Sequence, residues 1–189
     1  APMSLAGTPP QTEREGGSTG WKAEQLIESL AKNRQAEVRF EETAFSNLLT
    51  QPLKTQGILR FTPPTILEKH ITAPYDERYL VEGDTLLFES KTKGTNRTVS
   101  LQDYPALRAF IEAFRSTLAN DVITLRRLYS VTLQGEPRRW VLILRPLDKA
   151  VQELVESVRF SGEGEQVMAI EILAPDGDRS VMVITTGAQ

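Results

Sequence analysis

The chain has 189 residues, of which 40% are hydrophobic and 25% are charged, and its formal net charge is −3. This is the composition of an ordinary soluble protein, and a weakly acidic chain without a long basic run argues against nucleic-acid binding. The absence of cysteine excludes thiol catalysis, disulfides and cysteine–zinc sites. With one histidine, a multi-histidine metal site would need a second chain. The longest apolar runs are too short to cross a bilayer.

The first 20 residues differ from the rest in composition. They are rich in Gly, Pro, Ser and Thr and contain few large apolar side chains. We therefore predict a disordered tail over 1–20, followed by a single domain over 21–189. The chain begins at Ala1 rather than at methionine, which we interpret as signal-peptide removal or as trimming.

The first half of the chain after the tail reads as one helix and then strands. Apolar residues recur at helical spacing from Trp21 to Lys32, which predicts a helix with one buried face. Extended, alternating segments follow, with Pro52, Pro63, Pro64 and Pro74 at their ends. Strands are predicted over 36–45, 53–62, 65–72, 77–82, 85–89 and 96–101. The Gly83-Asp84 pair predicts a tight hairpin.

The middle of the chain changes to helical spacing and then returns to strands. Pro105 opens a predicted helix that ends at Leu118 and carries an apolar stripe. Residues 122–127 are expected to form a turn or a short helix. Further strands are predicted over 129–133, 140–145, 153–160, 166–173 and 180–185. About eleven strands joined mostly by short loops predict a mainly β fold: an unclosed antiparallel barrel with helices covering its concave face.

An ordered series of short motifs resembles the LolA family, the periplasmic carriers of outer-membrane lipoproteins. The motifs are "GILRFTPP", "ILEKHITAP" and "RYLVEGDTLLF", followed later by "LILRP" and "PDGDRSVMVI". The resemblance covers roughly residues 21–185. It implies an unclosed barrel under a helical lid, a cavity for acyl chains, a periplasmic location and a shuttle between membranes.

Two positions depart from the family's lipoprotein carrier. That carrier has an arginine before the proline, which ties the lid through backbone carbonyls, and Pro63 stands at this position here. An aromatic residue on the next strand corresponds to Lys69. We therefore expect a lid held by apolar contact rather than by a buried charged tie. Because Pro63 and Pro64 lack an N–H, we also expect weakened strand pairing at this edge.

The cavity lining is predicted from strand alternation and from the stripe on the middle helix. The same stripe is also what plain core packing of an amphipathic helix gives. The predicted lining residues are Leu59, Phe61, Leu67, Leu86, Phe88, Leu107, Phe110, Ile111, Phe114 and Trp140.

Polar candidates for catalysis or metal binding have simpler explanations. His70 is expected at the surface of a strand. Glu41 and Glu42 should point to opposite faces, at a solvated strand end. Asp176 and Asp178 flank Gly177 in a hairpin turn, which lacks the other oxygen ligands of a calcium loop. No cofactor, metal or catalytic residue is expected.

The function predicted from the sequence is a periplasmic carrier, without enzymatic activity. It would bind acyl chains of a lipoprotein or another lipid and shuttle them from an inner-membrane export complex to an outer-membrane acceptor, as a monomer. One alternative is a lipid-sensing regulatory or adaptor module with the same cavity. An enzyme on this fold is a second alternative, which the lack of an acid–base cluster disfavours.

Overall fold

The fold is built from eleven strands and a few helices. The computed structural model describes residues 20–33 and 35–185, so the predicted tail lies outside the described residues except for Gly20. The helices are α1 (Ala23–Asn33), η1 (Leu101–Asp103), α2 (Pro105–Leu118), α3 (Val122–Leu128) and α4 (Lys149–Gln152). The strands are β1 (Glu37–Phe45), β2 (Leu53–Thr62), β3 (Ile66–Ala73), β4 (Glu77–Glu82), β5 (Thr85–Ser90), β6 (Thr95–Ser100), β7 (Tyr129–Glu136), β8 (Arg139–Pro146), β9 (Ser157–Glu163), β10 (Gln166–Leu173) and β11 (Arg179–Thr185).

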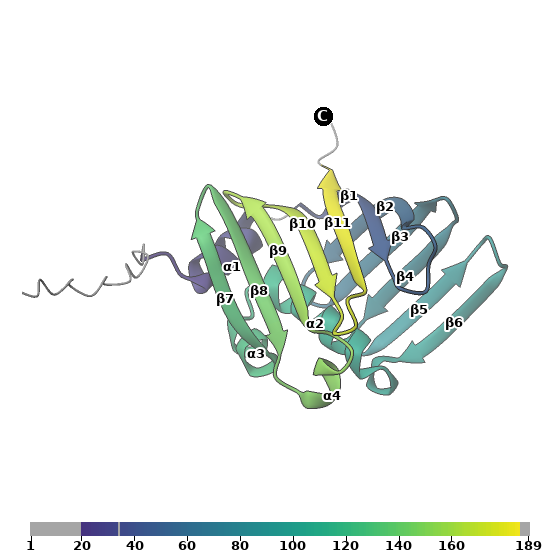
Figure 1. Cartoon of the computed structure of the whole chain (residues 1–189). Helices are drawn as coiled ribbons and strands as arrows, with labels where there is room; N and C mark the ends of the chain where they lie inside the picture. The colour runs from purple at the N-terminus through teal and green to yellow at the C-terminus, as the bar shows by residue number, and fades with distance from the viewer. Residues whose placement is uncertain (1–19, 34, 186–189) are drawn as a thin grey trace, which may run out of the picture.

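All eleven strands form one antiparallel sheet, in the order β6-β5-β4-β3-β2-β1-β11-β10-β9-β8-β7. Two meanders, β1–β6 and β7–β11, meet where β1 pairs with β11, for example Phe40 with Ile184. The two edge strands, β6 and β7, lie at opposite sides of the sheet in Figure 1. The sheet is therefore not closed into a barrel.

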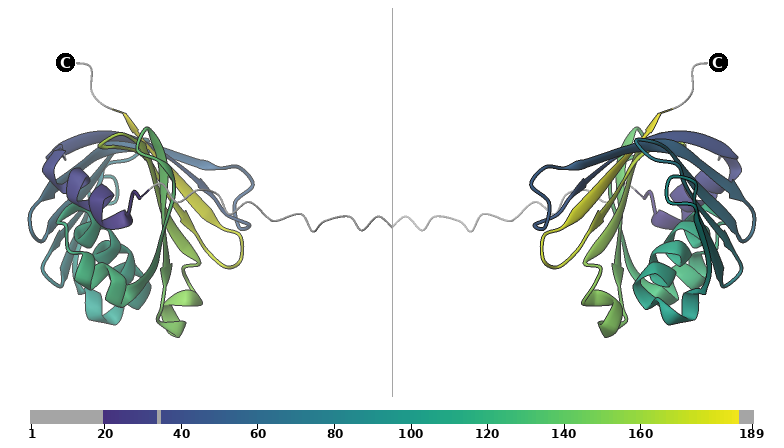
Figure 2. Two further views of the ribbon diagram at one scale, coloured as in Figure 1. Left: turned by 90° about the vertical axis from the view of Figure 1, so that its left-hand side faces the viewer. Right: turned by 90° about the vertical axis from the view of Figure 1, so that its right-hand side faces the viewer.

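The sheet curls around the helices. Figure 2 shows α1, α2 and α3 in the hollow of the curved sheet, with α4 at its rim. The buried core lies between this hollow and the helices, with Leu26 and Ile27 of α1, Phe114 of α2, and Phe40 and Phe160 of the sheet among its members. The predicted fold class, an unclosed antiparallel barrel with helices on the concave face, is confirmed.

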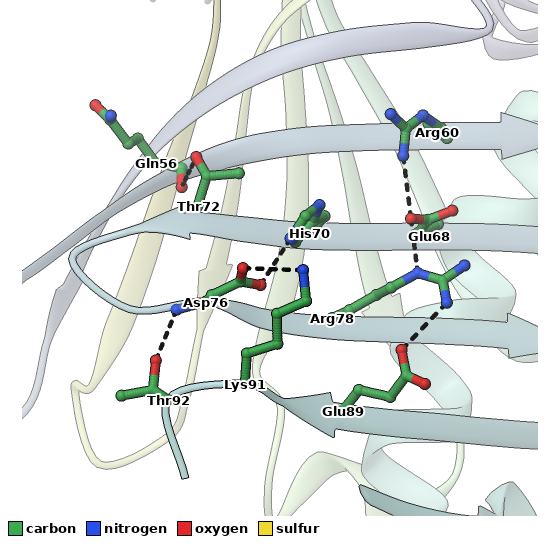
Figure 3. A network of polar contacts seen from close by, with 10 residues as sticks. All are labelled: Gln56, Arg60, Glu68, His70, Thr72, Asp76, Arg78, Glu89, Lys91 and Thr92. Atoms are coloured by element: carbon green, nitrogen blue, oxygen red, sulfur yellow. Dashed lines mark hydrogen bonds and ion pairs between the residues drawn. The ribbon is translucent and has the colours of Figure 1, made fainter. Parts of the chain in front are cut away.

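The convex face of β2 to β5 carries charged side chains that link neighbouring strands. Glu68 accepts hydrogen bonds from Arg60 Nη1 at 3.1 Å and from Arg78 Nε at 2.9 Å. Arg78 Nη1 also donates to Glu89 Oε2 at 3.2 Å. Figure 3 shows this convex-face network running across the strands, with His70 bonded to Asp76 beside it. His70 is partly exposed, which agrees with its predicted surface position.

Two local predictions were wrong. Residues 153–156 are not part of a strand: α4 precedes them, and β9 begins at Ser157. The α4 helix is set by Asp148, whose side chain accepts from the N–H groups of Ala150 and Val151. The turn that ends α4 continues into this segment, because the N–H groups of Leu154 and Val155 donate to the carbonyl of Val151. The expected weak edge at Pro63-Pro64 is also absent, because both prolines lie in the turn and Thr62 pairs with Ile66 directly beside it.

Candidate functional site

The helix α2 lies over the middle of the concave face and forms the roof of the candidate site. It begins with Pro105 at its first turn, where a missing N–H costs no helical hydrogen bond. At its other end Asn120 has a φ of 59°, and Asp121 accepts from the N–H of Thr124 at 3.0 Å. This cap starts α3 and turns the chain back toward β7.

Pocket A is the larger space between the first half of α2 and strands β1 to β5. Its volume is about 330 Å³, within the range of roughly 300–1,000 Å³ that is usual for small-molecule sites. The apolar lining residues are Ala44, Leu53, Leu67, Ile71, Val81, Leu86, Leu107, Phe110 and Ile111. Glu42, Thr55, Lys69, Tyr75 and Tyr79 complete the lining. The pocket is therefore apolar over most of its wall and polar in one part.

Pocket B is a smaller space under the second half of α2. Its volume is about 100 Å³. Its apolar wall comes from α1, α2 and both meanders: Leu30, Val38, Leu59, Phe61, Leu67, Phe114, Leu118, Phe160, Val167, Ile170 and Ile184. Gln35, Glu165 and Gln166 are its polar members, and Arg60 also borders it, although its guanidinium joins the convex-face network. Leu67 lines both pockets, so the two spaces are neighbours along the helix.

Aromatic rings separate the two pockets. Phe110 lines pocket A and Phe114 lines pocket B. Their rings meet edge to face with centroids 4.9 Å apart. Phe114 also meets Phe160 of β9 edge to face at 5.3 Å. Phe114 thus connects α2 to the sheet through an aromatic contact.

Eight of the ten predicted lining residues lie at these pockets, and two do not. Trp140 is almost fully buried, and its Nε1 donates to the carbonyl of Gly164 at 2.9 Å. A Cβ on Gly162 would lie 2.4 Å from the Trp140 ring, so this ring fills the space over β9. Phe88 is partly buried and packs on the far side of Tyr79, with ring centroids 5.0 Å apart.

A charged pair lies on the wall of pocket A, which the sequence did not predict. Lys69 Nζ donates to Glu42 Oε2, although β2 lies between their strands β3 and β1. Glu42 also accepts from the Ser180 hydroxyl. The Glu42 side chain is 15% exposed and that of Lys69 is 27% exposed. Glu41 and Glu42 do face opposite sides, but the expected solvated strand end is wrong for Glu42.

Two tyrosines lie beside this pair. Tyr79 is directly opposite Lys69 in the β3–β4 register, and its hydroxyl donates to Glu77 Oε2 at 3.1 Å. Burial raises the pKa of Tyr79 to about 12. Burial, followed by the nearby Glu77 and Glu42 carboxylates, also raises the pKa of Tyr75. Both phenols therefore remain protonated at neutral pH and keep a hydrogen to donate.

A polar contact that does not involve position 63 joins α2 to the sheet. The hydroxyl of Tyr129, the first residue of β7, donates to the carbonyl of Ala109 in α2. Tyr129 is 2% exposed, and burial raises the pKa of its phenol. Arg108 and Asp84 add an exposed ion pair at 3.6 Å between α2 and the β4–β5 turn. This buried tie is thus a neutral hydrogen bond.

The remaining polar candidates have structural roles. Asp178 accepts from the Ser46 hydroxyl at 2.6 Å and from the N–H of Asn47 at 2.8 Å. These bonds join the β10–β11 turn, which contains Gly177, to the β1–β2 loop. Within residues 20–33 and 35–185, no three His, Asp or Glu side chains form a group that could hold a metal. No helix in this part of the chain is long and apolar enough to cross a membrane.

The sheet is open and antiparallel, and the helix α2 covers apolar pockets in its hollow. These features define a class of hollow β proteins with a helical cover. The chain belongs to the family described as outer membrane lipoprotein carrier protein LolA-like, whose profile matches residues 16–189. This agrees with the resemblance found in the motifs. Among curated proteins, none matches the chain.

Solved structures with a similar chain course are distant in sequence. A LolA superfamily protein from Nitrosomonas europaea is 11% identical, with 86% of this chain and 91% of that chain covered and a TM-score of 0.43. MucB in its complex with MucA from Pseudomonas aeruginosa is 14% identical, with coverages of 88% and 57% and a TM-score of 0.45. LprF from Mycobacterium bovis is 11% identical, with coverages of 88% and 93% and a TM-score of 0.36. The family assignment therefore rests on the profile.

Proposed function

We propose that the protein is a periplasmic carrier that binds the acyl chains of a lipoprotein or another lipid beneath α2. It would take this cargo from an inner-membrane export complex and deliver it to an outer-membrane acceptor, without chemical change. The observation that carries the proposal is the pair of apolar pockets under one helix. Membership of the LolA-like family supports it.

The energetics of an acyl chain favour such a site. Each methylene that leaves apolar surroundings for water costs about 0.8 kcal/mol, so a chain of about sixteen carbons costs roughly 12 kcal/mol. The apolar walls of pockets A and B would offset most of this cost. Pocket B, at about 100 Å³, is too small to add much space while Phe110 and Phe114 stay in contact. We infer that cargo lifts α2 and joins the two pockets.

A lifting helix needs contacts that can slide. Phe110 and Phe114 hold α2 through ring contacts, and hydrophobic contact is non-directional. The buried hydrogen bond from Tyr129 to Ala109 contributes on the order of 1 kcal/mol. Lifting the helix therefore breaks no buried ion pair between lid and sheet among the described residues.

A binding assay with a fluorescent acyl probe tests the proposal. Phe110→Glu places a charge in the wall of pocket A and should abolish probe binding, because burial of an unpaired charge is costly. The matched control is Ile123→Glu on α3, where the side chain is 85% exposed, and it should bind as the wild type does. The melting temperature of each variant is measured alongside. Lack of binding by the wild type, or loss of binding only in proportion to unfolding, would contradict the proposal.

Transfer distinguishes a carrier from a lipid-sensing adaptor, which would use the same pockets. A carrier loaded with the probe should pass it to acceptor vesicles faster than the probe leaves into buffer. An adaptor would retain the probe and change its affinity for a protein partner. A loaded protein whose probe release is independent of acceptor vesicles would contradict the carrier function.

A further inference from the structure

Pocket A has a polar corner with a composition unlike that of a plain acyl cavity. The corner consists of Glu42, Lys69, Tyr75 and Tyr79, which all line the pocket. Apart from Thr55, the rest of the wall is aliphatic or aromatic. Such a corner would face one end of an amphiphile whose chain lies against the apolar wall.

The corner is balanced in charge. Lys69 donates to Glu42, and Glu42 also accepts from Ser180. The Lys69 ammonium further lies 5.3 Å from the centroid of the Phe40 ring. One cation and one anion thus satisfy each other on the pocket wall. A ligand with a net charge would compete with this pair and leave one of the two charges without its partner, which is costly in a partly buried place.

The corner still offers hydrogen bonds to a neutral group. Among the described residues, the Tyr75 hydroxyl has no hydrogen-bond partner in the structure, and Tyr75 is partly buried at the pocket. Thr55 adds a second hydroxyl, directly opposite Glu42 in the β1–β2 register. Hydroxyls both donate and accept. They suit the hydroxyl, ester or amide groups found at the head of an uncharged amphiphile.

We propose that pocket A selects amphiphiles whose head carries no net charge, through the Glu42–Lys69 pair and the neighbouring hydroxyls. The inference rests on the proposed function, because it names the chemical class of the cargo that lies under α2. An ester- or amide-linked acyl chain fits the corner, whereas a free carboxylate or an ammonium does not.

The test compares three ligands of equal chain length: a monoacylglycerol, a fatty acid and an alkylamine. Each displaces a neutral fluorescent acyl probe from the full chain at neutral pH, below its micelle-forming concentration. The monoacylglycerol should bind at least tenfold more tightly than either charged ligand. Equal affinities for all three ligands would overturn the inference, and this comparison needs no variant.

Two variants should switch the selectivity in opposite directions. Glu42→Gln leaves Lys69 unpaired and should make the fatty acid the preferred ligand. Lys69→Met leaves Glu42 unpaired and should make the alkylamine preferred. The double variant should again prefer the monoacylglycerol.

The matched controls are a carboxylate on β1, next to Glu42, and a lysine on the neighbouring strand β2, and both side chains alternate to the convex face. Glu41→Gln and Lys54→Met remove the same charges there and should keep the order of the wild type. If the probe binds but the order of ligand affinities is the same in every variant, the polar corner does not select the head group. The proposed carrier function would still stand in that case. If the probe does not bind the wild type, the proposed function itself fails.

Discussion

Phe110 and Phe114 lie one helical turn apart on α2, and each lines a different pocket while their rings touch edge to face at 4.9 Å. The contact makes them a partition between pockets A and B. Because both side chains belong to the same helix, a movement of α2 removes the partition at once. The proposed lid and the partition therefore belong to the same helix.

Removal of the Phe114 ring should open the partition without moving the helix. Phe114 is buried against Phe110 and Phe160, so Phe114→Ala should lower the free energy of unfolding by about 3–5 kcal/mol. A long acyl ligand should then raise the melting temperature of the variant more than that of the wild type, because it fills the new space. Thermal unfolding with and without ligand measures both effects.

The control for this variant is Phe45→Ala on β1. Phe45 lines neither pocket and packs against Arg179, whose guanidinium lies 4.5 Å from the ring centroid. Its removal should leave the effect of the ligand as in the wild type. An equal ligand effect in Phe114→Ala and the wild type would mean that Phe114 is ordinary core.

Loss of the Tyr129 hydroxyl should loosen the lid. The hydroxyl donates to the carbonyl of Ala109, so Tyr129→Phe should lower the free energy of unfolding by about 1 kcal/mol. Amides of α2 should exchange with solvent faster, while those of β8 should not change. Tyr104→Phe, at the start of the same helix, removes a hydroxyl from a half-exposed ring and should have no effect. Unchanged α2 exchange in Tyr129→Phe would exclude a latch.

A third prediction separates Trp140 from the site. A Cβ at Gly162 would lie 2.4 Å from the Trp140 ring and 2.1 Å from the carbonyl oxygen of Gln166. Gly162→Ala should therefore destabilise the fold by roughly 1–3 kcal/mol, as overpacking does. The affinity of the folded protein for an acyl probe should remain that of the wild type. Ser161→Ala next to it is the control, and a fall in affinity for Gly162→Ala alone would place Trp140 in the cavity wall.

The sequence predicted the parts of the site that depend on alternation and on helical spacing. Leu59 and Phe61 face the hollow because they lie two residues apart on β2, and the stripe on α2 gave Leu107, Phe110 and Ile111. Phe88 has the expected face, since it is opposite Tyr79 in the register. Its position along β5, however, places it behind Tyr79 and away from the pocket. Side-chain alternation along a strand predicts which face of the sheet a residue lies on. It does not predict whether the residue lies beneath α2.

The polar corner could not be predicted in this way. Lys69 reaches Glu42 across an intervening strand, and this requires the curvature of the sheet as well as its strand order. In the sequence, Lys69 and Glu42 each look like an ordinary charged side chain on the polar face of an amphipathic strand. One feature of the sequence indicated this corner: Lys69 stands where the family's lipoprotein carrier has an aromatic residue. That departure identified Lys69 but not its partner Glu42.

The convex-face network should make stability depend on acid pH. The hydrogen bond from Arg78, followed by the charges of Arg78 and Arg60, lowers the pKa of Glu68. A lowered carboxyl pKa stabilises the fold above the pKa of the unfolded chain, and this stability is lost as pH falls through the folded-state pKa. Glu68→Gln should therefore cost about 1 kcal/mol at pH 7, after allowance for the exposure of its partners.

The pH dependence of this cost is the informative part. The difference between wild type and Glu68→Gln should shrink below about pH 5 and vanish once Glu68 is protonated in the folded protein. Denaturant unfolding at several pH values measures it, with the exposed Glu82→Gln as control. A difference that is constant across this range would mean that the Glu68 charge contributes nothing.

Hydrogen exchange on α2 and β8, in the free protein and with an acyl ligand, tests most directly whether α2 is a lid over a cargo cavity. In the free protein the amides of residues 105–118 should exchange much faster than those of 140–145, because apolar contacts, one neutral hydrogen bond and one exposed ion pair hold the helix. The ligand should slow exchange in α2 and leave β8 unchanged. Equal protection of both segments, unaffected by ligand, would mean that α2 is permanent core and would contradict the account.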